Sequence, residues 1–298
     1  MEKNSFKVKV RNWLIQHPEI NPYEKYFPDR LFRRLTCPIR ILPDFLIIGA
    51  EKSGTTSLYD YIIQHPSVFP SMVKEVEFFE NKFSKEICFY KSNFPTKLSK
   101  FYFEKLKKIK FFTGEATPTY FFYPHAPNRV AKFLPQVKLI IILRNPVDRA
   151  YSNYNHSIRG KTEKLSFEEA IKSEKDRLNP ELSLIEKDDT YLSYSLRHHA
   201  YLLKGIYLKH IEMWQKYFDK ENFFIFSTEE LQNNPNKIVN EVFSFLELEK
   251  YDIVNLKKLN TGKYEEMKLE TRNYLIEYFK PYNEKLFNLI GKTFDWEK

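Results

Sequence analysis

The alternation of apolar and polar residues predicts strands and helices that follow one another along the chain. Continuous apolar runs at 45–48, 137–143 and 223–227 are typical of strands that are buried on both faces of a parallel sheet. The segment 111–117 predicts another short strand, which turns into a loop at Pro118. This order of strands and helices predicts a doubly wound α/β fold in three layers around a central parallel sheet.

Two capping boxes mark the starts of helices. Ser166 and Glu169 open the charged segment 166–178, which we expect to face solvent as an insertion, and Ser227 and Glu230 open a helix after the last strand. Apolar residues at helical spacing predict further helices at 98–110, 127–134, 195–218, 270–280 and 282–289, with Pro281 interrupting the last pair.

The stretch from Asp44 to Pro66 predicts a strand, an anion-binding loop and a helix. An apolar strand breaks at Gly49 into a short loop, and hydroxyl residues then open an amphipathic segment. Amide groups at a helix start lack intrahelical partners and lie at the positive end of the helix dipole, so this loop suits a phosphate or sulfate. The residues expected to hold the anion are Lys52, Ser53, Gly54, Thr55, Thr56 and Ser57.

The same loop is similar to a Walker A loop but differs in the place of its lysine. Gly49 and Gly54 keep the four-residue gap of GxxxxGK[ST], yet Thr55 follows the second glycine, and the lysine lies inside the loop at Lys52. The fold is therefore expected to resemble that of P-loop nucleoside triphosphatases, with a loop suited to a shorter anion.

A second anion-binding group is predicted at the end of the strand 137–143. Arg144 stands where the carboxyl end of this strand emerges, and ligands of open α/β sheets bind at that edge. Ser152 falls in the helix that follows, so Arg144 and Ser152 could grip a second phosphate. Taken alone, the pattern is equally compatible with a salt bridge between Arg144 and Asp148.

The segment 73–83 carries two carboxylates beside aromatic residues. Glu75 and Glu77 alternate with Val76 and Phe78 at a period of two. Partial desolvation raises the pKa of a carboxyl group, so either glutamate could serve as an acid or base. The alternative interpretation, an edge segment whose acids lie in water, is open as well.

Composition and charge narrow the class of protein. The 298 residues are 42% hydrophobic and lack any linker-like stretch, so we expect a single domain at 42–298. The basic residues 1–41 are expected to form an extension that packs on this domain. A net charge of +9 favours an anionic partner, although the lysines of 97–110 are expected to be a solvated surface.

The apolar runs, the two cysteines and the adjacent histidines indicate where the protein is located and whether it binds a metal. No apolar run reaches the ~20 residues that span a bilayer, so we expect a cytoplasmic protein without a membrane span, in which Cys37 and Cys88 are reduced thiols. Adjacent residues on a helix point in different directions, so His198 and His199 cannot share an ion, and no metal site is expected.

Two motifs together resemble sulfotransferases that use 3′-phosphoadenosine 5′-phosphosulfate (PAPS), closest to the branch of the heparan sulfate N- and 3-O-sulfotransferases. The chain reads LIIGAEKSGTTSL in the first motif and LRNPVDRAYSNY in the second, about 90 residues later, and the pair is more specific than either half. Similarity extends through KEVEFF, GEATPTYF and KYEEM. The resemblance implies the sulfotransferase fold and carbohydrate sulfation, with PAPS as donor, adenosine 3′,5′-bisphosphate (PAP) as product and no metal.

The resemblance also implies a role for each matching residue. The loop from Lys52 to Ser57 would hold the 5′-phosphosulfate, and Arg144 and Ser152 would hold the 3′-phosphate. Glu75 would be the general base, and Lys52 would also stabilise the leaving group. Lys263 and Tyr264, in the late loop, are expected to contact the donor.

Three positions depart from the pattern of the family. Glu77 stands where the animal 3-O enzymes have histidine, and Ala116 replaces a lysine near the acceptor. In the late loop, 260–262 reads Asn-Thr-Gly where related enzymes carry Lys-Gly-Arg. The sequence therefore predicts transfer of a sulfuryl group to a hydroxyl or amine, and leaves a nucleotide kinase or a non-catalytic polyanion-binding protein, including a nucleic-acid binder, as alternatives.

Overall fold

The computed structural model describes residues 32–256 and 264–297, and five parallel strands form the sheet within these ranges. Their spatial order is β2-β3-β1-β4-β5. The strands are β1 (Phe45–Gly49), β2 (Val68–Pro70), β3 (Phe112–Ala116), β4 (Lys138–Leu143) and β5 (Phe223–Ser227). The four predicted strands are confirmed; β2 has three residues and ends at a proline on the sheet edge, which gives no recognisable periodicity.

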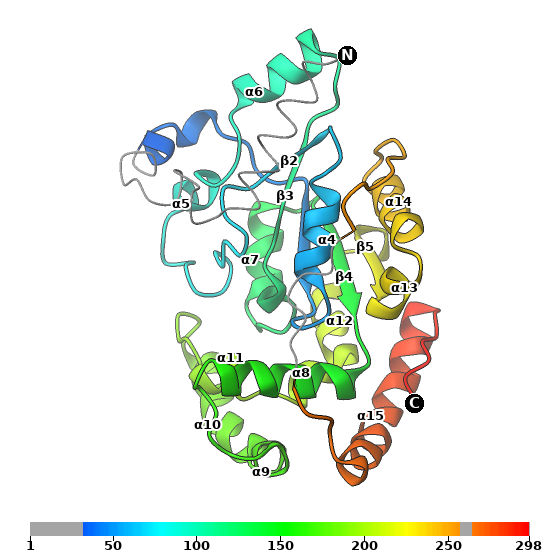
Figure 1. Cartoon of the computed structure of the whole chain (residues 1–298). Helices are drawn as coiled ribbons and strands as arrows, with labels where there is room; N and C mark the ends of the chain where they lie inside the picture. The colour runs from blue at the N-terminus through cyan, green and yellow to red at the C-terminus, as the bar shows by residue number, and fades with distance from the viewer. Residues whose placement is uncertain (1–31, 257–263, 298) are drawn as a thin grey trace.

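Helices cover both faces of the sheet, and this explains why β1, β4 and β5 are mostly apolar (Figure 1). Along β1, Phe45 and Ile47 pack with α4 (Thr55–Ile62) and α14 (Pro235–Phe245). Leu46 and Ile48 belong to the opposite core, with α7 (Ala126–Phe133) and α12 (Tyr207–Gln215). Neither face is left to solvent, so the predicted three-layer α/β fold is confirmed. The described residues also form the helices α8 (Pro146–Arg159), α9 (Phe167–Lys172), α10 (Glu174–Lys187), α11 (Tyr194–His198), α13 (Thr228–Asn233) and α15 (Leu269–Ile290).

The prediction of one helix at 195–218 is wrong. Helix α11 ends at His198, and a 3-10 turn, η4 (Leu203–Gly205), separates it from α12. The buried carboxylate of Glu174 accepts the amides of Tyr201, Leu202 and Leu203 at 2.7 to 2.9 Å, so these groups bond to a side chain in place of a helix ladder. An acceptor more than 25 residues away in the sequence therefore breaks the helix.

The predicted interruption at Pro281 is also wrong, because α15 runs through it. Pro281 is exposed, whereas Leu275, Phe279 and Leu286 on either side are buried. A proline removes one helix hydrogen bond, and packing of the apolar residues before and after it offsets that loss.

Both capping boxes are confirmed, at Ser166 with Glu169 and at Ser227 with Glu230. The segment after the first box forms two helices, α9 and α10, and it is not simply a solvent-facing insertion: Phe167 is buried and Glu174 reaches the interior.

The expectation of reduced thiols is wrong, since Cys37 and Cys88 form a disulfide. It joins η1 (Cys37–Ile39) to the start of α5 (Ile87–Lys91). Arg40 strengthens the same junction by donating to the carbonyl of Phe94 at 2.6 Å. Disulfides persist in oxidising compartments, and the cytoplasmic location expected from the sequence stays a prediction. Residues 1–31 of the expected extension lie outside the described residues.

Within the described ranges, none of the helices combines the length and the apolar character that crossing a bilayer requires.

Candidate active site

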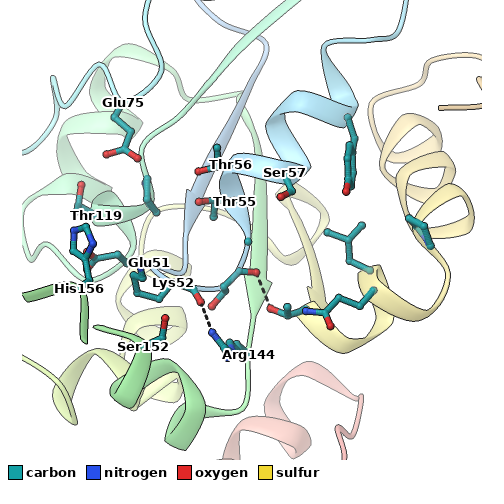
Figure 2. Close-up of a pocket in the computed structure, with 18 of the residues that line it drawn as sticks. Glu51, Lys52, Thr55, Thr56, Ser57, Glu75, Thr119, Arg144, Ser152 and His156 are labelled. Carbon is teal, nitrogen blue, oxygen red and sulfur yellow. Dashed lines mark hydrogen bonds between the residues drawn. The ribbon is translucent and has the colours of Figure 1, made fainter. Parts of the chain in front are cut away.

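A cavity of about 560 Å³ opens at the carboxyl edge of the sheet, where the loop after β1 meets α8 (Figure 2). Ligands of open α/β sheets bind at this edge. The site residues expected from the sequence that line it are Lys52, Ser53, Gly54, Thr55, Thr56, Ser57, Glu75, Arg144, Ser152 and Tyr264. Lys263, the remaining one, lies outside the described residues. Segments more than 200 residues apart in the sequence thus meet at one site.

The loop between β1 and α4 presents backbone amides to this cavity. Gly54 is the N-cap of α4 in the left-handed region, at a φ of +94°, and no side chain caps the helix. Lys52 is left-handed too, at +67°. The first amides of α4 have no partner inside the helix, and they lie in the part of the chain that lines the cavity. This geometry suits an anion.

Two buried hydroxyl groups support that interpretation. Ser53 Oγ and Thr119 Oγ1 form no hydrogen bond of normal geometry within the described part of the chain, and both residues line the cavity. Ser53 only approaches the Tyr207 hydroxyl, and Thr119 only approaches the Glu80 carboxyl. A buried hydroxyl without a well-formed hydrogen bond costs free energy, so an occupant with acceptor oxygens fits this wall.

Arg144 contacts the loop directly. Its Nη1 donates to the carbonyl oxygen of Lys52 at 3.2 Å. The salt bridge considered for Arg144 is absent from the described residues, because Asp148 pairs with Arg272 at 2.8 Å. The Tyr207 hydroxyl donates to the backbone carbonyl of Arg144 at 2.8 Å and fixes this strand end. The guanidinium is thereby held at the cavity wall.

Two cations, Lys52 and Arg144, and two carboxylates, Glu51 and Glu75, line the cavity. Each carboxylate pairs with a lysine outside the lining, Lys204 and Lys74 respectively. Burial lowers the pKa of the Lys52 ammonium, and the charges of Arg159 and Arg144 lower it further. Burial also lowers the pKa of the His156 imidazole, with Lys52 contributing. An anion bound among these groups would relieve their repulsion.

His156 is a cavity residue that the sequence analysis missed. It lies on α8, four residues after Ser152, and positions at this spacing share one helix face. That spacing is the signal that could have identified it. Leu231, Gln232 and Pro235, which also line the cavity, were missed as well because nothing local to these residues indicates a ligand.

Glu75 sits in a loop, so the interpretation of 73–83 as an edge segment is wrong. Glu75 and Glu77 are left-handed, at φ values of +64° and +56°, which is incompatible with a strand. The amide of Glu75 donates to the carbonyl of Ala116 at 3.1 Å. The Glu75 side chain is 42% exposed, pairs with Lys74 at 2.7 Å and lines the cavity.

A buried carboxylate holds this loop in place. Glu115 accepts the hydroxyl protons of Tyr90 at 2.9 Å, Thr117 at 2.6 Å and Tyr120 at 3.2 Å. The Tyr120 oxygen in turn accepts the amide of Phe78 at 2.8 Å. The backbone that carries Glu75 is therefore fixed on both sides of Val76, which is itself buried.

Glu77 does not line the cavity. Its carboxylate pairs with Arg197 at 2.7 Å and with Lys82 at 3.2 Å. Burial favours the neutral acid, but these two cations outweigh burial and lower the pKa of Glu77. Of the two glutamates, Glu75 is the one at the cavity.

Lys204 fixes Glu51, the residue before the anion-binding loop from Lys52 to Ser57. Its ammonium, almost fully buried, lies 2.8 Å from Glu51 Oε2 and 2.7 Å from the carbonyl of Arg197. Burial favours the neutral acid, yet Lys204 outweighs burial and lowers the pKa of Glu51. Glu51 lines the cavity, so this pair connects η4 to the site.

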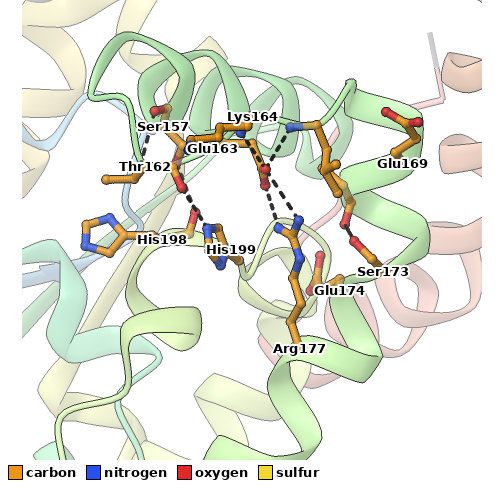
Figure 3. Close-up of polar contacts among 12 residues, drawn as sticks. Ser157, Thr162, Glu163, Lys164, Glu169, Ser173, Glu174, Arg177, His198 and His199 are labelled. Carbon is orange, nitrogen blue, oxygen red and sulfur yellow. Dashed lines mark hydrogen bonds and ion pairs between the residues drawn. The ribbon is translucent and has the colours of Figure 1, made fainter.

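Polar contacts link the end of α8 and the turn after it to His198 and His199, in the segment that leads to Lys204 (Figure 3). Ser157 Oγ donates to the carbonyl of His198 at 2.9 Å, and His199 Nε2 lies 2.9 Å from the carbonyl of Thr162. Nearby, Arg177 pairs with Glu163 at 2.6 Å. The His199 ring thus contacts a backbone carbonyl, and no cluster of three possible metal ligands occurs in the ranges that the structure describes.

Comparison with known proteins identifies the family. The family model described as "Sulfotransferase domain" matches residues 42–298. The chain belongs to the sulfotransferase family. This membership establishes an enzyme of the sulfotransferase class and decides against the nucleotide kinase considered above.

Individual relatives of this sulfotransferase share moderate identity with it. The membrane-associated sulfotransferase kil1 of Dictyostelium discoideum is 29% identical over 86% of this chain and 67% of its own length. Heparan sulfate glucosamine 3-O-sulfotransferase 5 of mouse is 28% identical over 87% of this chain and 75% of its own. The human bifunctional heparan sulfate N-deacetylase/N-sulfotransferase 3 is 31% identical over 84% of this chain. The match covers only 30% of the length of that enzyme.

A solved structure shares the architecture of this sulfotransferase. The sulfotransferase from Alicyclobacillus acidocaldarius superposes with a TM-score of 0.66 at 26% identity, covering 87% of this chain and all of that one. The fold expected from the sequence is thereby confirmed as the sulfotransferase fold.

Proposed function

We propose that this sulfotransferase moves a sulfuryl group from PAPS to a hydroxyl or amine of a carbohydrate acceptor. The observation that carries the proposal is the meeting of two anion-binding groups in one cavity. The loop from Lys52 to Ser57 supplies helix amides and hydroxyls, and Arg144 with Ser152 supplies the second group. A donor with phosphate groups at both ends of its ribose matches this pair.

The residues present fit this donor. The loop amides, Lys52 and the buried Ser53 hydroxyl would hold the 5′-phosphosulfate, while Arg144 and Ser152 would hold the 3′-phosphate. Leu231 and Pro235 offer an apolar wall for a base. When bound, PAPS supplies an activated sulfuryl group, and the chain's own task is to position and neutralise it.

Glu75 and Lys52 would carry the proton and the developing charge. The acceptor oxygen or nitrogen bonds to sulfur as the bond from sulfur to the phosphate oxygen breaks, and the acceptor's proton passes to the Glu75 carboxylate. Lys52 would stabilise the negative charge on the departing oxygen. Such charge stabilisation in a partly buried site contributes more than any other effect to the catalysis of many group transfers.

The carbohydrate acceptor rests on similarity. The N- and 3-O-sulfotransferases that resemble this chain are named for heparan sulfate. The cavity opens beside Glu75, whose side chain is exposed enough to meet a hydroxyl or amine from solvent. We therefore propose that the acceptor of this chain is also a glycan.

The test is transfer of labelled sulfate from PAPS to a panel of glycans, phenols and lipids. We expect Glu75→Gln to bind PAP as the wild type does and to lose turnover. The matched control is Glu86→Gln, an exposed glutamate at the N-cap of α5, which should retain full turnover. Unchanged turnover in Glu75→Gln would remove this residue from the mechanism.

The donor is tested separately by thermal shift. A ligand at 100 times its dissociation constant stabilises a protein by ~2.7 kcal/mol, so PAP should raise the melting temperature clearly. Stabilisation by Mg·ATP but not by PAP would contradict the assignment of the donor.

A further inference from the structure

An apolar stripe on the outside of the molecule has no role in the site described above. Helix α6 (Lys97–Phe101) continues into a π-helical turn, η2 (Tyr102–Leu106). Four large side chains follow one another at helical spacing and are exposed: Leu98 at 72%, Phe101 at 55%, Tyr102 at 42% and Leu106 at 66%. A surface helix normally turns such a face to the core, so its exposure points to a partner.

The opposite side of this element is firmly anchored. The Phe103 ring packs on Phe69, with centroids 4.5 Å apart, and on Phe111 at 5.9 Å. Because Phe103 faces inward, the exposed stripe is held outward by packing. Figure 1 shows α6 at the end of the molecule opposite to α9.

Lysines surround the stripe. Residues 97–111 contain six lysines and one glutamate, and that glutamate, Glu104, lies 3.8 Å from Lys100. The exposed lysines of this stretch are Lys97, Lys105, Lys107, Lys108 and Lys110. Apolar side chains framed by cations match the boundary of a bilayer, where the former enter the headgroup region and the latter meet anionic headgroups.

We propose that this stripe, Leu98, Phe101, Tyr102 and Leu106 with the neighbouring lysines, docks the protein on a membrane surface containing anionic lipid. A second copy of the chain fits less well, because pairing two such faces would bring their lysines together. An anionic bilayer satisfies both the apolar and the charged groups.

The position of the stripe leaves the active site accessible. The segment after η2 leads into the amino end of β3 at Phe112, whereas the cavity lies at the carboxyl edge of the sheet. Docking therefore turns the cavity away from the bilayer, and sulfate transfer to a soluble acceptor does not depend on it.

The test is co-sedimentation with two kinds of vesicle, phosphatidylcholine alone and phosphatidylcholine with phosphatidylserine. We expect binding to the second kind, weakening as salt is raised. The variant Leu98→Ser/Phe101→Ser/Leu106→Ser should bind at least about 10-fold more weakly. A lysine near an anionic surface contributes about 1 kcal/mol, so Lys105→Gln/Lys107→Gln/Lys108→Gln should bind about 10²-fold more weakly.

The control variant is Leu269→Ser, since Leu269 has a similar exposure, 70%, at the start of α15. It should bind vesicles as the wild type does, and all variants should keep the wild-type rate on a soluble acceptor. Three results would overturn the proposal: equal vesicle binding by the stripe variants, a dimer that the stripe variants lose, or a marked drop in their melting temperature, which would mean that the chain itself covers the stripe.

Discussion

Arg144 donates from Nη1 to the carbonyl oxygen of Lys52 at 3.2 Å, and this contact joins the two halves of the cavity. The loop after β1 and the end of β4 are 92 residues apart in the sequence, yet one hydrogen bond fixes their relative position. The loop and Arg144 can therefore bind the two anionic ends of one ligand at a fixed distance from each other.

Replacing Arg144 should weaken one end of the donor selectively. Hydrogen bonds to charged groups contribute ~1.5–3 kcal/mol, so we expect Arg144→Lys to lose about 10- to 100-fold in affinity for PAP by calorimetry. Affinity for adenosine 5′-phosphosulfate, which lacks the 3′-phosphate, should change little. The control is Arg272→Lys, which alters the partner of Asp148 outside the cavity. Equal losses for both nucleotides would contradict the assignment of Arg144 to the 3′-phosphate.

The pair of Lys204 and Glu51 should matter strongly for stability. Removing one partner of a buried ion pair leaves the other charge uncompensated and costs about 3–5 kcal/mol. Lys204→Met should lower the free energy of unfolding in urea by that amount, and Lys204→Met/Glu51→Gln should recover part of it. Lys209→Met, on the exposed side of α12, serves as the control. A double variant no better than the single one would argue against a direct charge pair.

Glu80 should make stability depend on pH. Burial raises the pKa of its carboxyl to about 8 from an ordinary value of 4.5. Between these values the folded protein keeps a proton that the unfolded chain releases, so the free energy of unfolding falls as pH rises from 4.5 towards 8. Melting temperatures across this window should decline less in Glu80→Gln than in the wild type. The exposed control, Glu212→Gln, should follow the wild-type profile, and an unchanged slope in Glu80→Gln would show that another group is responsible.

The disulfide between Cys37 and Cys88 should stabilise the junction of η1 and α5. It closes a loop with a sequence separation of 51 residues, for which the expected contribution is about 2–4 kcal/mol. Reduction, or Cys37→Ser, should lower the free energy of unfolding accordingly, while Thr36→Ser keeps the bond and serves as a control. If dithiothreitol leaves the wild-type melting temperature unchanged, the bond does not contribute to stability.

Local patterns in the sequence were sufficient for much of the fold and the donor side of the site. Three apolar runs predicted β1, β4 and β5, because burial on both faces favours apolar side chains, and the segment 111–117 predicted β3. The loop from Gly49 to Ser57 was recognisable because glycine, lysine and hydroxyl residues at a helix start are suited to binding an anion. Glu75 and Arg144 were found from motifs that are equally local, and all these residues line one cavity.

Contacts between segments far apart in the sequence decided the features that the local patterns did not predict. The sequence alone determined four of the five described strands, the capping boxes and the anion-binding loop, since each depends on residues within a few positions of one another. Tertiary structure decided that Glu174 breaks the helix at 199–206, that packing carries α15 through Pro281, and that Cys37 meets Cys88. The same is true of Lys204 beside Glu51, because a buried charge finds its partner only once the chain has brought both together.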